Sequence, residues 1–282
     1  MNDWLTSLRE FAGAWDLFRD AVWANLLAGL MLGWLGVYVL LRRIVFLSAA
    51  VTQAASLGVV LAFWLGTVTS LVLPPMLVAA VCTTLAVLLL TRNAGHAAPS
   101  DWRLGVVYLL GSAATLVLAS KVPQEIHDID ALLFGSGVAV MHDDYTSVIG
   151  LAAVILPWQV WWWRGISGAS FDPRGARVRG LPVPLLEITL MLHLSLVIAL
   201  STRVVGALPT FALGLLPAMT VLSLSQSLFR ALVASSLVGG AVAAGGYVAA
   251  YVWNAPVGAS QTLVGLIVLA LGRLVALLRT RN

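Results

Sequence analysis

Apolar runs long enough to cross a membrane recur along most of the chain and leave only short polar links between them. About 20 consecutive apolar residues span a bilayer as an α-helix. Hydrophobic residues make up 60% of the 282 residues and charged residues only 10%, whereas soluble domains carry about 25% charge. Such a chain has too little polar surface to face water on all sides. We therefore predict an integral membrane protein.

Nine such runs can be delimited, which predicts an all-α, polytopic bundle of about nine spans. Backbone polar groups find no water inside a bilayer, so each span is expected to be helical. The seventh run is short, and Pro209, Gly214 and Pro217 are expected to bend or break it. The predicted spans cover roughly residues 21–41, 44–65, 70–90, 104–120, 146–163, 184–206, 208–222, 231–252 and 259–278.

The domain organisation is predicted to be one polytopic transmembrane domain, residues 21–282, preceded by an interfacial segment, residues 1–20. Apolar residues of the first segment recur at helical spacing, which predicts an amphipathic helix lying on the membrane surface. This segment lacks the basic start of a cleavable signal peptide. Arginines cluster after the odd-numbered spans, so those links are expected in the cytoplasm and the N-terminus outside.

Several functional classes are excluded by motifs that the sequence lacks. It contains no Gly-x-x-x-x-Gly-Lys-Ser/Thr phosphate-binding loop, no nucleophile elbow and no zinc-protease helix motif. We therefore expect neither an enzyme nor a covalently bound cofactor. The pI near 9.7 reflects cations that flank the spans, so no nucleic acid partner is expected.

The second predicted span carries a strip of polar and small residues into the bilayer. Ala49, Gln53 and Ser56 share one helix face, at positions i, i+4 and i+7. Such a strip often faces the bundle interior or a water-filled path. Small and hydroxyl residues equally allow helices to pack closely. The pattern alone leaves both interpretations open.

Two ionisable residues, Glu187 and His193, lie within the sixth predicted span. Ionisable residues inside a membrane are functional candidates by default. They are six residues apart, about 120° off a common face, so they form no ready chelate. Each also has a structural interpretation: His193 as a hydrogen-bonded packing residue, and Glu187 as the partner of an arginine in the preceding loop.

Carboxylates and imidazoles cluster in the outer segment between the fourth and fifth spans. Such groups ligate or attract divalent cations. The alternative is a solvated acidic loop that docks a binding protein. The outer metal candidates are His127, Asp128, Asp130, His142, Asp143 and Asp144.

Four stretches resemble, in order, the permease subunit of bacterial zinc and manganese ABC importers. Each stretch alone is weak, but their order and spacing are fairly specific for that family. The stretches are Gly33 to Gly58 with Arg42-Arg43, Leu133-Phe134-Gly135-Ser136 with Ala139-Val140, Phe171-Asp172-Pro173 with Ala176 and Gly180, and Val204-Val205-Gly206 through Leu215-Leu216-Pro217-Ala218 and Ser227 to Pro256-Val257-Gly258-Ala259.

The resemblance implies a permease homodimer in the bacterial inner membrane, driven by cytoplasmic ABC ATPase subunits and supplied by an extracytoplasmic metal-binding protein. Zinc or manganese would be the substrate. In that family an Asp and a His ligand stand at the positions of Ala49 and Gln53. Ala49 offers no ligand, and the neutral amide of Gln53 is a poor zinc ligand.

The same resemblance implies where the chain contacts its ATPase. It places a coupling helix at Ser225, Gln226, Ser227, Leu228, Phe229 and Arg230. The residues themselves are equally compatible with a plain interfacial turn. Glycines in the eighth span predict a close helix contact, with the dimer seam as one candidate. They are Gly239, Gly240, Gly245 and Gly246.

Three other functions stay open at this point. The first is an ABC permease of the same fold with a non-metal or altered cargo, because the family ligands are replaced at positions 49 and 53. The second is an ion-coupled secondary transporter, although no internal repeat is visible. The third is a scaffold subunit that transports nothing and would tolerate alanine at Gln53 and His193.

Overall fold

The computed structural model describes residues 3–69, 73–91, 101–122, 140 and 142–280, and within these residues the chain is helical with no strand. The helices are α1 (Asp3–Gly13), α2 (Trp15–Leu41), α3 (Val45–Thr69), α4 (Pro75–Thr91), α5 (Asp101–Ala119), α7 (His142–Phe171), α8 (Pro173–Val178), α9 (Val183–Val204), α10 (Ala207–Leu213), α11 (Leu216–Leu222), α12 (Leu228–Trp253) and α13 (Val257–Thr280).

The described helices confirm the predicted bundle, and the number of full-length spans is lower than nine. Seven of them are long and apolar enough to cross a membrane: α2, α3, α5, α7, α9, α12 and α13. The third and seventh predicted runs are shorter apolar segments, Pro75–Thr91 and Ala207–Leu222. Every predicted run thus contains helix where it is described, and two of the nine are short.

The seventh run is broken, as its glycine and prolines predict. Gly206 has a φ of 102° between α9 and α10, a left-handed conformation that favours glycine. The break between α10 and α11 falls at Gly214 and Leu215, and Pro217 lies in the first turn of α11. Proline lacks an N–H group, so the first turn is where a helix tolerates it. Pro209 lies inside α10 without ending it.

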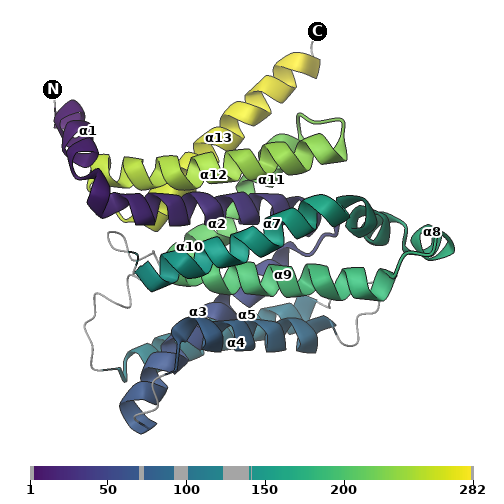
Figure 1. The fold of residues 1–282 in the computed structure, drawn as a ribbon, viewed down its shortest axis with the longest axis horizontal. Helices are drawn as coiled ribbons and strands as arrows, with labels where there is room; N and C mark the ends of the chain where they lie inside the picture. Colours follow the sequence, from purple (N-terminus) through teal and green to yellow (C-terminus); the bar gives the residue numbers. More distant parts are fainter. Residues whose placement is uncertain (1–2, 70–72, 92–100, 123–139, 141, 281–282) are drawn as a thin grey trace.

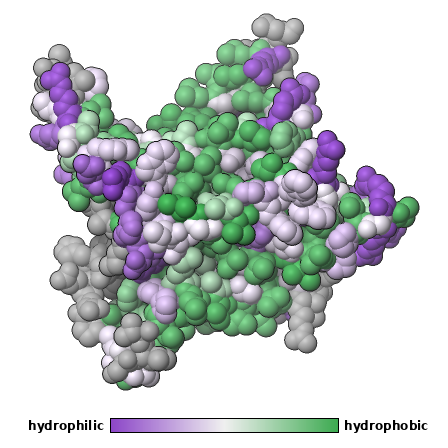
Figure 2. All heavy atoms as spheres, in the orientation of Figure 1, coloured by the Kyte–Doolittle hydropathy of each residue, from purple (hydrophilic) through white to green (hydrophobic). Residues whose placement is uncertain are grey.

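The links after the first, fifth and seventh predicted spans lie at one end of the bundle, as the charge pattern predicts. Arg42, which follows α2, forms an ion pair with Glu187 near the start of α9. Phe229, at the start of α12, packs against Trp163 of α7. Figure 2 shows hydrophilic side chains gathered toward two opposite edges of the face in view, with hydrophobic side chains between them. The structure therefore has the polarity that a bilayer requires.

Helices α2 and α12 lie side by side and form the most intimate helix pair of the bundle (Figure 1). A Cβ atom on Gly29 would collide with the Gly239 carbonyl, and a Cβ atom on Gly33 with the Ser235 carbonyl. The Ser235 hydroxyl also donates to the Gly33 carbonyl at 2.6 Å. Gly239 therefore packs against α2 of the same chain and is not available for a contact between two copies.

The other glycines of α12 divide between packed and open positions. A Cβ atom on Gly240 would lie 3.0 Å from Leu30, and one on Gly246 would lie 2.5 Å from the Cα atom of Gln261 in α13. A Cβ atom on Gly245 would meet nothing within 4 Å among the described residues. Gly245 is thus the only one of the four that the described part of the chain leaves free for a partner.

The N-terminal segment contains the predicted helix, α1, which ends before α2 begins at Trp15. Phe11 stacks on Phe18 of α2, with ring centroids 5.1 Å apart, and lies 5.2 Å from the ring of Tyr251 in α12. Trp4, nearer the N-terminus, is exposed. One end of α1 is thus held by an aromatic cluster, and its position on a membrane surface stays a prediction.

Candidate translocation path and coupling site

The predicted polar strip lies on α3, between α4, α5, α9 and α10. Ser56 is fully buried, and its hydroxyl donates to the Thr52 carbonyl at 3.3 Å. Ala49 and Gln53 are half-buried, and the Gln53 amide makes no hydrogen bond to another described residue. Gly111 of α5 lies close to Gln53, because a Cβ atom on Gly111 would be 3.0 Å from the Gln53 Cβ atom. Gln53 therefore keeps its carbonyl oxygen available.

A small internal cavity lies beside this strip, on the side of Ser48 and Thr52 rather than of Ala49 and Gln53. Its volume, about 10 Å³, corresponds to roughly one water molecule. The cavity is bounded by α2, α3, α9, α10 and the α10–α11 break, through Leu32, Leu35, Gly36, Val39, Ser48, Thr52, Leu194, Ile198, Thr210, Phe211 and Gly214. The broken segment therefore forms one wall of the cavity.

Glu187 is held in an ion pair at the end of the bundle that is predicted to be cytoplasmic. Its Oε1 atom lies 3.4 Å from Nη2 of Arg42, and the Arg42 Nε atom donates to the Ser170 hydroxyl at 3.1 Å. Burial lowers the pKa of the Arg42 guanidinium, and Glu187 opposes that shift. The partner is an arginine, as one interpretation predicts. This arginine comes from the α2–α3 link, and pairing with an arginine of the preceding loop stays a prediction.

His193 lies in the middle of α9 and is 8% exposed. Its Nδ1 atom is buried and has no hydrogen-bond partner among the described residues. The predicted packing role through a hydrogen bond to Nδ1 therefore finds no partner in the described chain. Six further side chains of the described chain have a buried polar atom in this condition: Trp34, Gln159 (both amide atoms), Ser201, Thr202, Ser260 and Gln261 (Oε1).

Helical spacing relates Trp34 and Gln159 to a contact between α2 and α7. The Tyr38 hydroxyl lies 3.4 Å from the Trp163 carbonyl, which joins α2 to α7 at that level. Trp34 and Gln159 lie one helical turn farther along the same faces. Neither residue was predicted from the sequence, although Gln159 follows Pro157 within an otherwise apolar run. A polar residue at mid-span beside a proline was the available signal.

The outer acidic cluster is only partly described, and its described half makes contacts within the protein. Asp144 pairs with Arg203 at 3.4 Å, and His142 lies 3.2 Å from Asp20. Asp143 accepts hydrogen bonds from the Thr146 and Ser147 hydroxyls through its backbone carbonyl. Three of the predicted outer metal candidates, His127, Asp128 and Asp130, lie outside the described residues. No group of three metal-ligating side chains occurs within the described part of the chain.

The predicted coupling helix is not a separate helix. A turn follows α11, and α12 begins at Leu228, so Ser225, Gln226 and Ser227 belong to the turn. The Ser225 hydroxyl donates to the Ser227 carbonyl at 3.0 Å and so closes the turn. The ring of Phe229 packs 4.9 Å from that of Trp163 in α7. The segment is a short, braced turn because serine hydroxyls compete with helical hydrogen bonds there.

Comparison with known proteins decides which kind of membrane protein this bundle is. Residues 14–276 match the ABC 3 transport family. This chain belongs to the ABC 3 transport family. The manganese transport system membrane protein MntC of Halalkalibacterium halodurans is 26% identical over 258 residues, which cover 92% of this chain and 87% of the relative. A probable iron transport system membrane protein of Haemophilus influenzae is 27% identical over 250 residues, which cover 85% and 87% of the two chains.

A solved structure supports the same assignment for this ABC 3 transport protein. PsaBC from Streptococcus pneumoniae, in complex with Fab, is 26% identical, with a TM-score of 0.82 over 94% of this chain and 95% of that chain. The family resemblance carried by the sequence is thereby confirmed, and so is the polytopic helical fold. The chain is the membrane-spanning permease of an ABC transporter.

Proposed function

We propose that this permease carries a divalent metal ion into the cell and that manganese is the first ion to test. The observation that carries the proposal is the match over nearly the whole chain to relatives named for manganese and iron transport. Carbonyl, carboxylate and water oxygens suit manganese, whereas zinc prefers imidazole and thiolate. Gln53, with its unbonded amide, supplies an oxygen of the first kind.

The proposed assembly contains two copies of this chain, two separate ATPase chains and an extracytoplasmic metal-binding protein, all at the bacterial inner membrane. The lack of a phosphate-binding loop in the sequence supports a separate ATPase chain. A second copy is supported by the long apolar faces that α5 and α13 leave exposed in one chain. In such a dimer, each copy would contribute one Gln53 to a shared path.

The path would hold its ion weakly. Ala49 offers no ligand, Glu187 is engaged by Arg42, and Ser56 is bonded to its own helix. An ion passing Gln53 would therefore keep most of its hydration shell. We infer that selectivity is set before the ion reaches the bilayer, by the binding protein and the outer segment, while Gln53 and His193 serve passage.

The decisive experiment is whole-cell elemental analysis of strains with and without this gene in metal-starved medium. We expect a selective fall in cellular manganese without the gene and its recovery on complementation. A strain complemented with an Arg230→Glu variant should stay low, because its ATPase coupling is disturbed. If no divalent metal changes, the metal cargo is wrong.

The replaced ligands favour one alternative, an ABC permease with a cargo other than a free metal ion. The double variant Ala49→Asp, Gln53→His separates the two functions. It should alter metal affinity or metal preference in a metal importer, because it creates an Asp–His pair on one helix face. It should leave all metal uptake unchanged if the cargo differs. Copurification of an ATPase chain would exclude the ion-coupled secondary transporter.

A further inference from the structure

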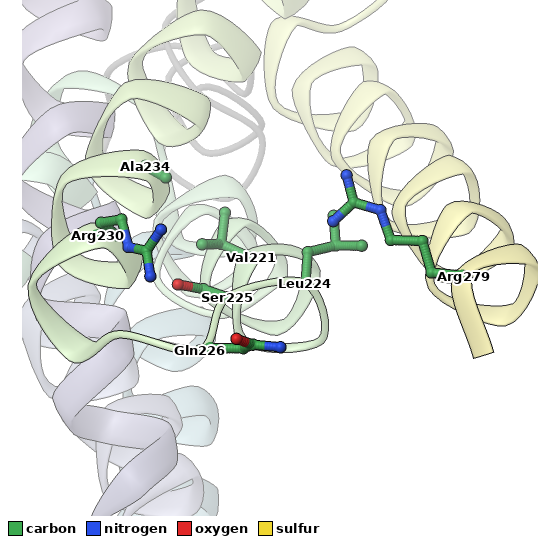
Figure 3. Close-up of a pocket in the computed structure, with 7 residues that line it drawn as sticks. All are labelled: Val221, Leu224, Ser225, Gln226, Arg230, Ala234 and Arg279. Carbon is green, nitrogen blue, oxygen red and sulfur yellow. The ribbon is translucent and has the colours of Figure 1, made fainter. Parts of the chain in front are cut away.

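A hollow of about 440 Å³ opens at the predicted cytoplasmic end of the bundle, between the α11–α12 turn and the last turn of α13 (Figure 3). Pockets that bind ligands measure roughly 300–1,000 Å³, so this one accommodates several side-chain groups rather than a single ion. We call it the arginine hollow; it is lined by Val221, Leu224, Ser225, Gln226, Arg230, Ala234 and Arg279.

The arginine hollow has a cation on each of two walls. Arg230 comes from the first turns of α12 and Arg279 from the end of α13, and Figure 3 shows them on opposite sides of the turn that carries Ser225 and Gln226. No carboxylate of the described chain forms an ion pair with either one. By contrast, Arg42 has Glu187, at 3.4 Å.

The chemistry of these walls selects an anionic occupant. Two guanidinium groups around one space favour a carboxylate or a phosphate, because each offers a planar fork of donors. Ser225 and Gln226 add neutral hydrogen-bonding groups, and Val221, Leu224 and Ala234 supply an apolar floor. An acidic side chain carried on a folded surface meets all three features.

We propose that the arginine hollow receives an acidic side chain of the ATPase subunit and that Arg279 is a second anchor beside Arg230. This proposal rests on the proposed function, since it assumes a separate ATPase chain. The hollow is continuous with the predicted coupling segment, which supplies Ser225, Gln226 and Arg230 to its wall. It adds the end of the last helix, which sequence analysis left without a role.

Anchoring at Arg279 would connect the ATPase to the broken seventh segment. Two glycines let α13 approach α11 closely. A Cβ atom on Gly272 would lie 2.5 Å from Thr220, and one on Gly265 would lie 2.9 Å from Leu216. A displacement of the end of α13 therefore reaches α11, which adjoins the small cavity beside α3 through the α10–α11 break.

The test compares charge reversals in the complete transporter, purified through a tag on this chain. Arg279→Glu and Arg230→Glu should each lower the copurified ATPase about tenfold or more, because a like charge then faces the acidic partner. Arg279→Lys should retain most binding. Arg273→Glu is the matched control, since Arg273 lies on α13, is exposed and does not line the hollow; it should change binding less than about twofold.

A crosslinking measurement identifies the occupant directly. Cys82 is the single cysteine of the chain, so Cys82→Ala provides a background into which Gln226→Cys places one photoreactive label. A crosslink to the ATPase chain supports the proposal. A lipid adduct, or a crosslink to a second copy of this chain, overturns it. Copurified ATPase that is unaffected by Arg279→Glu also overturns it, whereas failure of the unchanged chain to bring down any ATPase defeats the proposed function itself.

Discussion

Two regions of the permease bury polar side chains beside the same helix, α2, and differ in how far these side chains are hydrogen-bonded. At the seam with α12 and α13, the fully buried Gln261 donates from Nε2 to Asn25 Oδ1 at 2.7 Å and to the Ala243 carbonyl at 2.9 Å, while its Oε1 atom has no partner within the described chain. At the junction with α7, the equally buried Gln159 has no hydrogen-bond partner for either amide atom within the described chain. An unsatisfied buried polar group costs about 1–3 kcal/mol.

The difference separates a scaffold from a region that is free to rearrange. The α2–α12 seam combines backbone contact through glycine with hydrogen bonds from Ser235 and Ser236 to α2 carbonyls. Close packing and these hydrogen bonds favour one arrangement. The α2–α7–α9 junction is packed with aliphatic side chains but leaves Trp34, Gln159 and His193 unsatisfied. Rearrangement there would break no hydrogen bond of these three side chains.

The largest effect on stability is expected from a substitution that overpacks the contact between α2 and α12. Gly33→Ala places a Cβ atom on the Ser235 carbonyl, and neither backbone can yield without moving a helix. Overpacking costs about 1–3 kcal/mol, and a backbone clash belongs at the upper end of that range. We expect little folded protein and a much lower midpoint of thermal unfolding in detergent. Gly245→Ala on α12 is the control and should unfold like the unchanged chain.

A large effect on transport, without loss of folding, is expected at the coupling turn. Phe229→Ala combined with Arg230→Glu removes the contact with Trp163 and reverses the charge at the arginine hollow. Manganese uptake should fall about tenfold or more. Gln53→Ala removes one neutral oxygen and should lower uptake only about twofold, because a hydrated ion loses a single weak ligand. Equal uptake by the two variants would contradict the placement of the coupling turn.

An intermediate effect on stability is expected at the outer end of α9. Arg203 pairs with Asp144 of α7 at 3.4 Å, and its guanidinium lies 5.4 Å from the Phe63 ring centroid. The two side chains are 15% and 21% exposed, so Arg203→Gln should cost about 1–2 kcal/mol, less than the 3–5 kcal/mol of a fully buried pair. The double variant with Asp144→Asn should recover part of that loss. A strictly additive double variant would show that the pair does not couple α7 to α9.

The two regions also differ in how much of their structure could be predicted from the sequence. Apolar length predicted the helices, and Gly214 with Pro217 predicted the broken segment, because both signals are local. The pairing of Glu187 with Arg42 was not predicted, since Arg42 is distant in sequence and comes from another link. Gln159 and Trp34 were missed because a missing hydrogen bond is a property of three helices together. The hollow beside Arg279 depends on how α13 leaves the bundle, which no run of residues encodes by itself.

The smallest effects are expected at the two buried glutamines, and they are the most informative. Replacing Gln159 and replacing Gln261 should change the free energy of unfolding in opposite directions. Gln159→Met removes two unsatisfied polar atoms from an apolar junction and should raise the free energy of unfolding by about 1 kcal/mol. Gln261→Met removes the donor to Asn25 and Ala243 and should lower it by about 1–2 kcal/mol. Thermal and denaturant unfolding in one detergent measure both variants.

Uptake then shows what the unsatisfied groups do. If Gln159 and His193 serve the rearrangement of the junction, Gln159→Met and His193→Leu should stabilise the protein and slow manganese uptake, because stability and movement oppose each other at such sites. If the variants are stabilised and still transport normally, Gln159 and His193 have no role in transport. A Gln159→Met variant that unfolds as readily as Gln261→Met would show instead that buried water completes the hydrogen bonds of the junction, and the two regions would then be equally fixed.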